Sequence, residues 1–306
     1  MKITDHLADG PRTVAEVARA TGAHESSLAR YLRLCAMHGL VTKTDNGGYA
    51  LTEVGHLLRS DVPSLRGFVI AVNGPGMTRC WEDVPAVLRT GEPTSREKWG
   101  LEHWQYYEEH PEEARSHAEG LHMMSVEMAD GIAASYDFSR FVTIADIGGS
   151  PGTLLARALR AAPKARGILL DLPGAIIHAR ELMESTERVE FVSGDFLDTV
   201  PADCDLYLLK HILLDLDDDR AARLLENCYK AAAPGSSLLV VDWVMTSEPS
   251  FVHAMDVECM VLSGGRVRTT DELIALLADA GYTRIAERPL QGFERVPARV
   301  IEAVRP

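Results

Sequence analysis

The sequence predicts an α/β protein in which a mostly parallel, doubly wound sheet is preceded by a smaller, mainly helical unit. Two observations predict this fold class. From residue 141 onward, short apolar runs alternate with stretches of helical spacing, and within the first sixty residues two helical patterns precede a hairpin signal. Strands that alternate with helices form βαβ units, which give a parallel sheet with helices on both faces. The length of 306 residues also suits two domains better than one small core.

The first sixty residues follow the order helix, turn, helix, hairpin. Thr13 and Glu16 have the spacing of a capping box at a helix start, and Gly22 ends that helix. A second helix is expected from about Glu25. The Asp-Asn-Gly-Gly stretch at 45–48 lies between two short apolar runs, which is a strong hairpin signal. This order is typical of a winged helix.

The charge of the chain argues against a nucleic-acid partner. The formal net charge is −14, so the average surface repels phosphate backbones. The winged-helix-like unit is itself nearly neutral, and only Arg30 and Arg33 are basic on the helix that would read DNA. We therefore expect a dimerisation or lid module, and we prefer it over a transcriptional regulator.

Residues 61–138 are expected to form helices that are interrupted at Pro63, at 74–76 and at 91–93, where Gly and Pro gather. The segment holds a cluster of aromatic side chains, Trp81, Trp99, Trp104, Tyr106 and Tyr107. Most of them are expected to fill helix interfaces, and one or two to wall a pocket for a flat organic substrate.

The strands and helices of the sheet follow from residue 139. The predicted strands are 142–147, 167–170, 189–192, 206–209 and 237–241, and the predicted helices are 154–162, 174–184 and 219–233. The three consecutive acids at 217–219 are interpreted as a helix cap that complements the helix dipole, and not as a metal cluster.

The strongest local signal is the loop Asp146–Gly152, between the first strand and the first helix of the sheet. Its glycines let the backbone approach a ligand closely before the chain turns into the helix. Asp171 follows at the end of the second strand, where a carboxylate can accept two hydrogen bonds from a ribose diol. Both features predict a nucleoside-containing cofactor at the carboxyl edge of the sheet.

The loop lacks the Gly-x-Gly-x-x-Gly spacing of dinucleotide-binding proteins. Asp146 before Gly148 and Gly149 suits a cofactor with a positive amino group better than a pyrophosphate. Asp195 and Phe196, after the third strand, can hold an adenine by hydrogen bonding and stacking. The plainer alternative is an α/β scaffold with ordinary turn residues, and the ordered set of three strand-end features disfavours it.

The chain resembles the O-methyltransferases shared by plant phenolic metabolism and bacterial natural-product tailoring, most closely the anthracycline-tailoring branch. The matching stretches span essentially the whole chain and are His6–Thr13, Tyr49–Thr52, Asp146–Gly152, Gly194–Phe196, Ala233–Gly235 and Gly264–Thr269. The resemblance implies a winged-helix dimerisation domain, a Rossmann-like catalytic domain and S-adenosylmethionine as cofactor. It implies that Gly148 and Gly149 line the methionine end of the cofactor, that Asp171 holds the ribose, and that Asp195 and Phe196 hold the adenine.

We accordingly divide the chain into three parts. Residues 1–90 are expected to form the winged-helix-like dimerisation domain, residues 91–138 a helical linker that contributes to the substrate pocket, and residues 139–306 the Rossmann-like catalytic domain. Family members usually carry a few more helical turns before the part that matches Ile3–Leu7, and these help to interlock the dimer. A homodimer is still expected, because exposed apolar stripes need covering.

The sequence departs from the family at the catalytic base. Leu214 stands where the family has a general-base His, and Val267 replaces one of the two acids that support that His, whereas Asp242 keeps the other. General-base catalysis is typically worth about 10²- to 10⁴-fold. Proximity and orientation alone contribute roughly 7–11 kcal/mol, so methyl transfer without a base is physically acceptable, especially to an acidic phenol. The alternative keeps the cofactor but performs hydroxylation, decarboxylation or rearrangement, as one relative in the resembling branch does.

The candidate site residues fall into three groups. The cofactor-binding candidates are Asp146, Gly148, Gly149, Asp171, Leu172, Asp195, Phe196 and Lys210, the catalytic candidates are His211, Asp242 and His253, and the substrate-pocket candidates are Trp104, Met123, Met124, Leu214, Asp215 and Met260. His211 would lie one helical turn before Leu214 if that segment were helical. His211, Asp215 and His253 are plausible metal ligands by type, but no spacing makes them converge, so no metal is expected.

The expected function is therefore methylation of a hydroxyl, which the resemblance implies to be phenolic, on an aromatic or polyketide-like secondary metabolite. No apolar run approaches the roughly 20 residues that span a bilayer, and the N-terminus lacks the apolar core of a signal peptide. The five cysteines have neither zinc-site nor disulfide spacing and are expected to be reduced, mostly buried thiols. These observations predict a cytoplasmic protein without a membrane partner.

Overall fold

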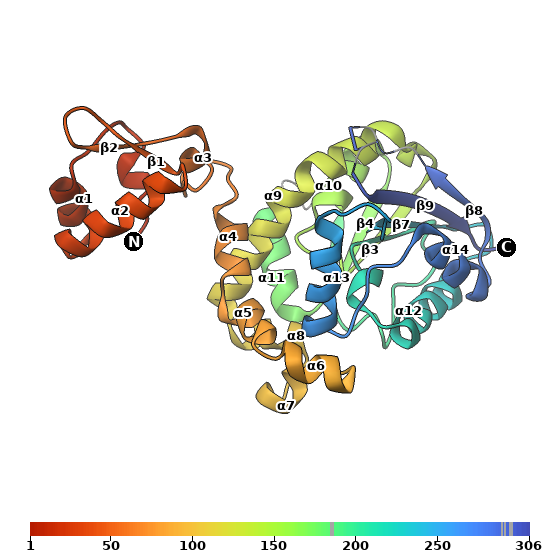
Figure 1. The fold of residues 1–306 in the computed structure, drawn as a ribbon. Coiled ribbons are helices and arrows are strands. Elements are labelled where there is room, and N and C mark those ends of the chain that lie inside the picture. Colours follow the sequence, from red (N-terminus) through yellow and green to blue (C-terminus); the bar gives the residue numbers. More distant parts are fainter. Residues whose placement is uncertain (184–186, 289, 291, 294–295) are drawn as a thin grey trace. The chain divides into compact units, whose positions relative to one another are not determined.

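The computed structural model describes residues 1–183, 187–288, 290, 292–293 and 296–306, which fold as two compact units, Met1–Ile70 and Ala71–Pro306 (Figure 1).

The first unit has the predicted winged-helix order. Its elements are η1 (Asp5–Leu7), α1 (Val14–Thr21), α2 (Glu25–Met37), β1 (Val41–Lys43), β2 (Tyr49–Leu51) and α3 (Glu53–His56). The capping box is confirmed, because the Glu16 amide donates to Thr13 Oγ1 at 3.3 Å and the Thr13 amide donates to Glu16 Oε2 at 2.8 Å. Gly22 ends α1 in the left-handed region at φ 71°. β1 and β2 pair antiparallel as the predicted hairpin.

The second unit begins with helices that carry the predicted interruptions. α4 (Arg66–Val72) leads into it, and α5 (Pro75–Trp81), α6 (Val84–Thr90), α7 (Ser95–Trp99), α8 (His103–Glu109), the long α9 (Pro111–Ser135) and η2 (Phe138–Arg140) follow. Gly91 ends α6 at φ 76°, where a side chain would be strained.

The sheet has seven strands in the order β5-β4-β3-β6-β7-β9-β8. The strands are β3 (Thr143–Ile147), β4 (Arg166–Asp171), β5 (Val189–Ser193), β6 (Leu206–Lys210), β7 (Ser237–Trp243), β8 (Thr283–Arg288) and β9 (Ala298–Val304). The predicted strands are all present and all parallel. β8 and β9 are additional, and β9 pairs antiparallel with both β7 and β8.

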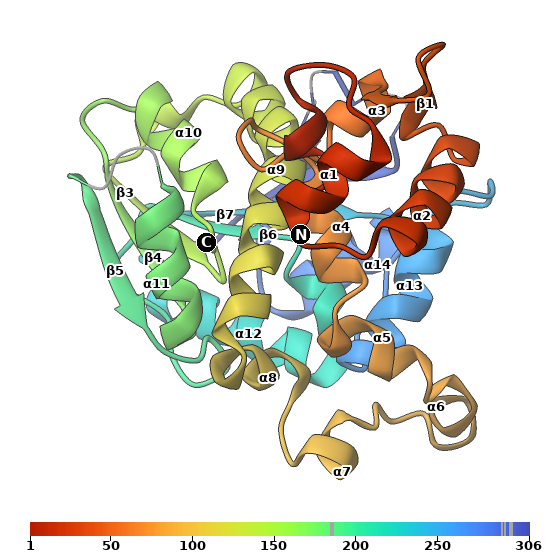
Figure 2. The ribbon, with the colours of Figure 1, turned by 90° about the vertical axis from the view of Figure 1, so that its left-hand side faces the viewer.

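Helices cover both faces of the sheet, as predicted (Figures 1 and 2). The helices that follow the sheet strands are α10 (Thr153–Ala161), α11 (Pro173–Leu182), η3 (Leu213–Asp215), α12 (Asp218–Ala231), α13 (Phe251–Leu262) and α14 (Thr270–Asp279). α9, α10 and α11 pack on one face, where Ile132 and Leu155 are fully buried, and α12 and α14 pack on the other, where Leu224 is fully buried. The predicted helix at 174–184 matches α11, and its last predicted residue lies outside the described residues.

The five cysteines are free and buried, as predicted. Among the residues that the structure describes, no helix is long and apolar enough to cross a membrane.

Candidate active site

The carboxyl ends of five neighbouring strands meet at one edge of the sheet. The register aligns Ile147 with Leu170 and Asp171 with Ser193, so β3, β4 and β5 end together. Lys210 at the end of β6 is aligned with Val241 near the end of β7. Ligands of open α/β sheets bind at this edge, and all predicted cofactor-binding residues lie on or just after these strand ends.

The glycine loop approaches its surroundings too closely for side chains. Gly148 has φ 64°, and a Cβ there would lie 2.6 Å from Ile212 Cδ1 and 3.3 Å from Phe196 Cε1. A Cβ on Gly149 would lie 2.3 Å from Asp146 Cγ. The loop therefore requires glycine at both positions, and it brings bare backbone beside the carboxylate of Asp146.

Asp146 is an orphaned buried acid. Its side chain is 1% exposed, and neither carboxylate oxygen has a hydrogen-bond partner among the described residues. Burial raises the pKa of Asp146 to about 7, and the negative charge of Asp171 adds to this, whereas Lys210 opposes it. A buried polar group without a partner is costly in a native structure unless a ligand or water satisfies it.

Lys210 interacts electrostatically with one acid on β3 and with another near the end of β7. Its ammonium donates to Ser125 Oγ of α9 at 3.0 Å. Burial lowers the pKa of Lys210, and the charges of Asp146 and Asp242 act against that shift. The positive charge of Lys210 is thus flanked electrostatically by both acids.

Asp171 lies where the prediction places the ribose. Its Oδ2 accepts from the Ser150 amide at 3.0 Å and its Oδ1 accepts from the Leu172 amide at 2.8 Å. Burial raises the pKa of Asp171 to about 6. Each carboxylate oxygen keeps a further lone pair, so the group that organises the loop retains acceptor capacity for a diol.

The predicted adenine residues lie at the end of β5. Asp195 is exposed, and its Oδ1 accepts from the Leu197 amide at 2.8 Å. Phe196 is half-buried beside Gly148, and its carbonyl accepts from Asn227 Nδ2 at 3.0 Å. The structure thus brings the edge of the Phe196 ring next to the glycine loop.

Leu214, the residue that stands where a base is expected from the resemblance, is buried in η3. Its amide donates to Asp242 Oδ2 at 3.2 Å, and the Trp243 amide donates to Asp242 Oδ1 at 3.0 Å. Asp242 is 2% exposed. Burial, and then repulsion from Asp215, raises the pKa of Asp242 to about 8, against the opposing effects of the two amides and of Arg268.

Asp215 adds a second acid beside Leu214. Burial, and then the charge of Glu258, raises the pKa of Asp215 to about 7. The Cys259 thiol of α13 donates weakly to Asp215 Oδ1 at 3.9 Å. The region around Leu214 is therefore lined by carboxyl groups that titrate near neutral pH.

His211 lies next to this region but not as one turn of an α-helix. The segment is a short 3₁₀ turn, and His211 precedes it in the left-handed region at φ 57°. The imidazole stacks on the Trp243 ring at 5.2 Å between centroids and 16° between planes, and its Nε2 has no partner among the described residues. Burial, and then the charge of Lys210, lowers the pKa of His211 well below its usual value.

The remaining predicted site residues lie on helices and differ from one another in exposure and in contacts. His253 is exposed in the first turn of α13, where its Nδ1 accepts from the Ser250 amide at 3.3 Å in a capping box. Met123 is half-buried on α9, whereas Met124 is exposed. Met260 packs against a buried cluster that includes Met77 and Val261. Asp217 caps α12 as predicted, accepting from the Arg220 amide at 2.8 Å.

Trp104 joins an aromatic group that holds two residues missed in the sequence. Its ring lies 5.0 Å from that of His103 and 5.7 Å from that of His117, between centroids. His103 is 1% exposed, and neither of its ring nitrogens nor the Tyr107 hydroxyl has a partner among the described residues. Burial lowers the pKa of His103 to about 3, so the ring is neutral. The aromatic clustering was visible in the sequence, but the burial of His103 was not.

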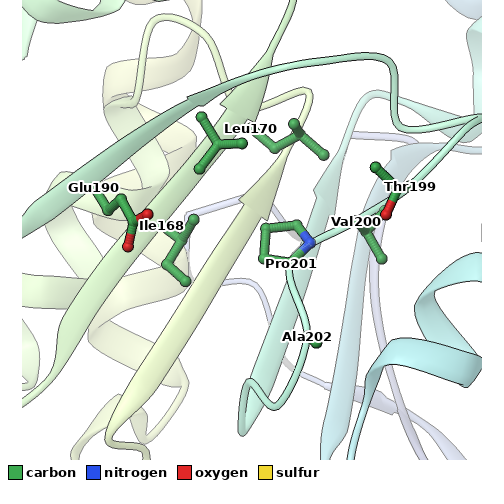
Figure 3. A pocket seen from close by; sticks show the side chains of 8 residues that line it. Ile168, Leu170, Glu190, Thr199, Val200, Pro201 and Ala202 are labelled. Atoms are coloured by element: carbon green, nitrogen blue, oxygen red, sulfur yellow. The ribbon is translucent and has the colours of Figure 1, made fainter.

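An open pocket lies on the sheet face between β4, β5 and the segment 199–202 (Figure 3). Its lining is Ile168, Leu170, Glu190, Val192, Thr199, Val200, Pro201 and Ala202. None of the predicted site residues belongs to this lining. In the part of the chain that the structure describes, no three His, Cys, Asp or Glu side chains are grouped as metal ligands.

Two family models match the chain. The O-methyltransferase dimerisation domain matches residues 1–61, and the O-methyltransferase domain matches residues 81–283. Among curated relatives, the phenazine O-methyltransferase PhzM of Lysobacter antibioticus is 36% identical, covering 98% of this chain and 89% of the relative. The mitomycin biosynthesis 6-O-methyltransferase of Streptomyces lavendulae is 35% identical, covering 99% and 88%.

Solved structures agree with these relatives. The crystal structure of LaPhzM superposes with a TM-score of 0.92 at 35% identity, covering 100% of this chain and 92% of that one. The O-methyltransferase NcsB1 from neocarzinostatin biosynthesis, in complex with S-adenosylmethionine and 2-hydroxy-5-methyl naphthoic acid, superposes with a TM-score of 0.83 at 32% identity, covering 100% and 93%. These similarities are all to methyltransferases and do not favour the alternative of a repurposed chemistry. The chain belongs to the O-methyltransferase family and is an S-adenosylmethionine-dependent enzyme related to those of bacterial natural-product biosynthesis.

Proposed function

We propose that this enzyme methylates a phenolic hydroxyl of an aromatic or polyketide-like secondary metabolite, and that it does so largely by positioning the acceptor. The observation that carries the proposal concerns Leu214, a buried apolar residue at the position where a base is expected. Its amide donates to the carboxyl group of Asp242. A phenol is acidic enough to react without a strong base once it is held in place. The relatives that are named for phenazine and naphthoate substrates support an aromatic acceptor.

The residues at the sheet edge fit S-adenosylmethionine. Asp146 has two buried oxygens beside Gly149 that no described residue hydrogen-bonds, and these suit the positive amino group of the methionine end. We assign Asp171 and Leu172 to the ribose and Asp195 and Phe196 to the adenine, and Lys210 to balancing the charge of Asp146. The bound cofactor supplies an electrophilic methyl group on a sulfonium centre.

Asp242 is the better of the two candidate proton acceptors. A base is effective when its pKa lies near the working pH, and the pKa of Asp242 is about 8. The pKa of His211 lies well below its usual value, which makes that imidazole a weak base. We assign proton uptake to Asp242 and an orienting role to His211, whose ring lies flat against Trp243. His253 remains a weaker candidate, because its Nδ1 is engaged in the cap of α13.

We assign the acceptor pocket to Leu214, Asp215 and the helical part 91–138. Trp104 brings the aromatic surface, and Met123, Met124 and Met260 bring side chains that adapt to a large apolar ligand. Met124 is exposed on α9, so it lines this pocket only when another surface covers that part of the helix.

The domain matched at residues 1–61 is proposed to form a homodimer. On α2 the side chains of Tyr31, Leu34 and Met37 share one face and are 53%, 48% and 72% exposed. Such a stripe is covered in a dimer by a second copy of the chain. The buried free thiols fit a reducing compartment, and we place the enzyme in the cytoplasm.

A series of substituted phenols of graded acidity tests the proposal, with matched anilines as comparison. The rate of methylation at fixed pH is expected to rise with phenol acidity, because the site lacks a strong base. Methylation confined to the anilines would contradict the hydroxyl acceptor.

Asp171→Ala is expected to weaken S-adenosylmethionine binding by about 1.5–3 kcal/mol, the cost of losing a hydrogen bond to a charged group. The substitution also removes the acceptor of the Ser150 and Leu172 amides. Calorimetric titration measures the effect. Asp198→Ala, which removes an exposed carboxylate paired with Arg223, is the control and should bind as the wild type does. Equal affinities of the two variants would exclude the ribose role of Asp171.

Leu214→His is expected to raise the methylation rate of weakly acidic phenols by about 10²-fold, the lower end of what general-base catalysis contributes. The new imidazole would be carried by a residue whose amide already donates to Asp242 Oδ2, so that a carboxyl group lies close to the residue. Leu214→Gln introduces polarity without a base and serves as the control. If the histidine variant is no faster than the glutamine variant on any hydroxyl, the pocket is not arranged for a base at this position.

A further inference from the structure

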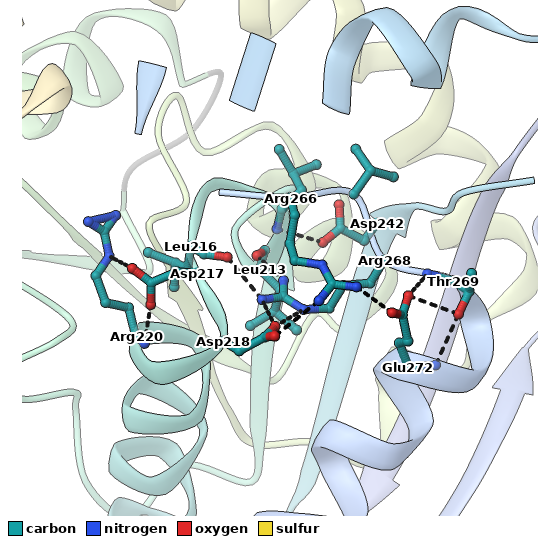
Figure 4. A network of polar contacts seen from close by, with 12 residues as sticks. Leu213, Leu216, Asp217, Asp218, Arg220, Asp242, Arg266, Arg268, Thr269 and Glu272 are labelled. Carbon is teal, nitrogen blue, oxygen red and sulfur yellow. Dashed lines mark hydrogen bonds and ion pairs between the residues drawn. The ribbon is translucent and has the colours of Figure 1, made fainter. Parts of the chain in front are cut away.

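Arg268 is a fully engaged, buried arginine at the start of α14. It is 3% exposed, and its Nη1 donates to the Leu213 carbonyl at 2.6 Å while its Nη2 donates to the Leu216 carbonyl at 2.9 Å (Figure 4). Nε and Nη2 both donate to Asp218 Oδ1, at 3.0 and 2.7 Å. The planar guanidinium thus holds two backbone carbonyls and one carboxylate at once, which a lysine cannot reproduce.

The two carbonyls lie at the two ends of the short turn η3. They belong to Leu213 and Leu216, which flank Leu214, the residue at the expected position of the base, and Asp215. Fixing both ends of this short turn fixes the direction of the Leu214 amide, which donates to Asp242 Oδ2 at 3.2 Å. A chain of contacts therefore runs from Arg268 through η3 to the Asp242 carboxyl group.

The outer side of Arg268 is anchored as well. Arg266 pairs with Asp218 Oδ2 at 3.0 Å and with Glu272, and Glu272 accepts from the Thr269 amide at 2.8 Å at the start of α14 (Figure 4). Asp218 is exposed and Arg266 is partly exposed, so these outer pairs contribute little stability themselves. Arg268 makes its own contacts to Asp218 Oδ1 and to the two carbonyls, none of which involves Arg266.

Four charged or titratable groups face Asp242 from the elements around it. They are Asp215 of η3, Lys210 of β6, Cys259 of α13 and Arg268. Lys210 and Arg268 favour the ionised carboxylate, whereas Asp215 opposes it. Unlike Lys210, Arg268 acts on Asp242 in two ways, by its positive charge and by holding η3, whose Leu214 amide donates to Asp242.

We propose that Arg268 is a positioning residue for methyl transfer, which holds η3 so that the Leu214 amide fixes the place and the ionisation of the Asp242 carboxyl group. Its consequence for catalysis rests on the proposed function, in which Asp242 takes up the proton of the acceptor.

The test compares Arg268→Met, which removes all donors, with Arg268→Lys, which keeps the charge but not the fork. Arg266→Met is the matched control, because Arg266 contacts Asp218 and Glu272 but neither carbonyl. The ionisation of Asp242 is followed by the carbon-13 NMR titration of its carboxyl group in cofactor-free protein, assigned with Asp242→Asn. We expect the pKa of Asp242 to rise by about one unit in Arg268→Met, by less in Arg268→Lys, and not at all in Arg266→Met.

The same variants are then assayed for methyl transfer. A pKa rise of about one unit leaves roughly tenfold less carboxylate at neutral pH, so kcat of Arg268→Met should fall about tenfold and its rising pH limb should move upward. The cofactor Kd should change little. A merely structural role would lower the melting temperature without moving the Asp242 titration, and that result would overturn the proposal. Wild-type kcat in Asp242→Asn would instead refute the proposed proton acceptor, and the NMR titration would still decide whether Arg268 governs Asp242.

Discussion

Asp242→Asn is expected to lower kcat about 10²-fold while leaving S-adenosylmethionine affinity close to that of the wild type. The loss lies at the lower end of the range for general-base catalysis, because positioning of the acceptor is retained. The wild-type rate should rise with pH through about 8, the pKa of Asp242, and this limb should flatten in the variant. Asn also accepts only one of the two amide hydrogen bonds, so some loss of stability is expected.

The matched control for this variant is Asp205→Asn. Asp205 Oδ2 likewise accepts two backbone amides, from Val142 and Thr143, both at 2.9 Å, but at the opposite end of the strands. This control should lose stability without a change in the pH profile of kcat. A rising limb that persists unchanged in Asp242→Asn would show that another group takes the proton.

The raised pKa of Asp242 has a further consequence for the stability of the cofactor-free protein. The folded state holds its proton up to about pH 8, whereas an unfolded Asp loses it near 3.8. This contribution to the free energy of unfolding is fully present below the unfolded value and is lost as pH rises through the folded value. As pH rises from about 5 to about 8, the free energy of unfolding should therefore fall less in Asp242→Asn than in the wild type. Chemical denaturation at several pH values measures this difference.

Asp146→Asn is expected to weaken S-adenosylmethionine binding by at least about 100-fold, because a buried positive group would lose its charged partner. In the wild type, binding of the ammonium requires the carboxylate form of a group whose pKa is about 7. Affinity should therefore improve as pH rises through about 7, with release of a proton, and the variant should show neither effect. Calorimetry in buffers of different ionisation enthalpy measures both.

The Asp205→Asn protein serves again as the control and should keep both the affinity and the proton release. Wild-type affinity in Asp146→Asn, together with unchanged proton release, would remove Asp146 from the cofactor site. Loss of affinity without any pH dependence in the wild type would mean that the cofactor amine binds elsewhere and that Asp146 only shapes the glycine loop.

Much of the fold could be predicted because its local signals agree with its tertiary structure. In the first unit, Thr13 and Gly22 mark the ends of α1 and the 45–48 turn marks the hairpin, and the alternation of strands and helices predicts the sheet. β8 and β9 escaped prediction because they form an antiparallel hairpin with charged residues such as Arg284, Glu287 and Glu302, so neither reads as a buried apolar run. Glu302 is nevertheless 2% exposed and paired with Arg288 and Arg140, which only the folded chain can show.

The candidate site likewise has residues that could be predicted from the sequence and residues that could not. The ends of parallel strands meet at one edge, so Asp146, Asp171 and Lys210 could be grouped from sequence alone. Residues on helices could not, because the side that a helix turns inward depends on its packing. His253 is exposed in a helix cap, and His103 is buried with neither ring nitrogen hydrogen-bonded to a described residue. The contacts of Arg268 were equally hidden, since its main partners are backbone carbonyls, which no residue pattern encodes.

Methyl transfer to a phenol is tested most directly by a single-turnover reaction of the purified enzyme with S-adenosylmethionine and a panel of phenols, read by mass spectrometry. We expect one phenol of the panel to gain the mass of a single methyl substitution and an equal amount of S-adenosylhomocysteine to form. We also expect this transfer to slow in Asp242→Asn while the cofactor stays bound. Cofactor that binds but is not consumed, or a product that gains a different mass, would contradict the proposed methyl transfer.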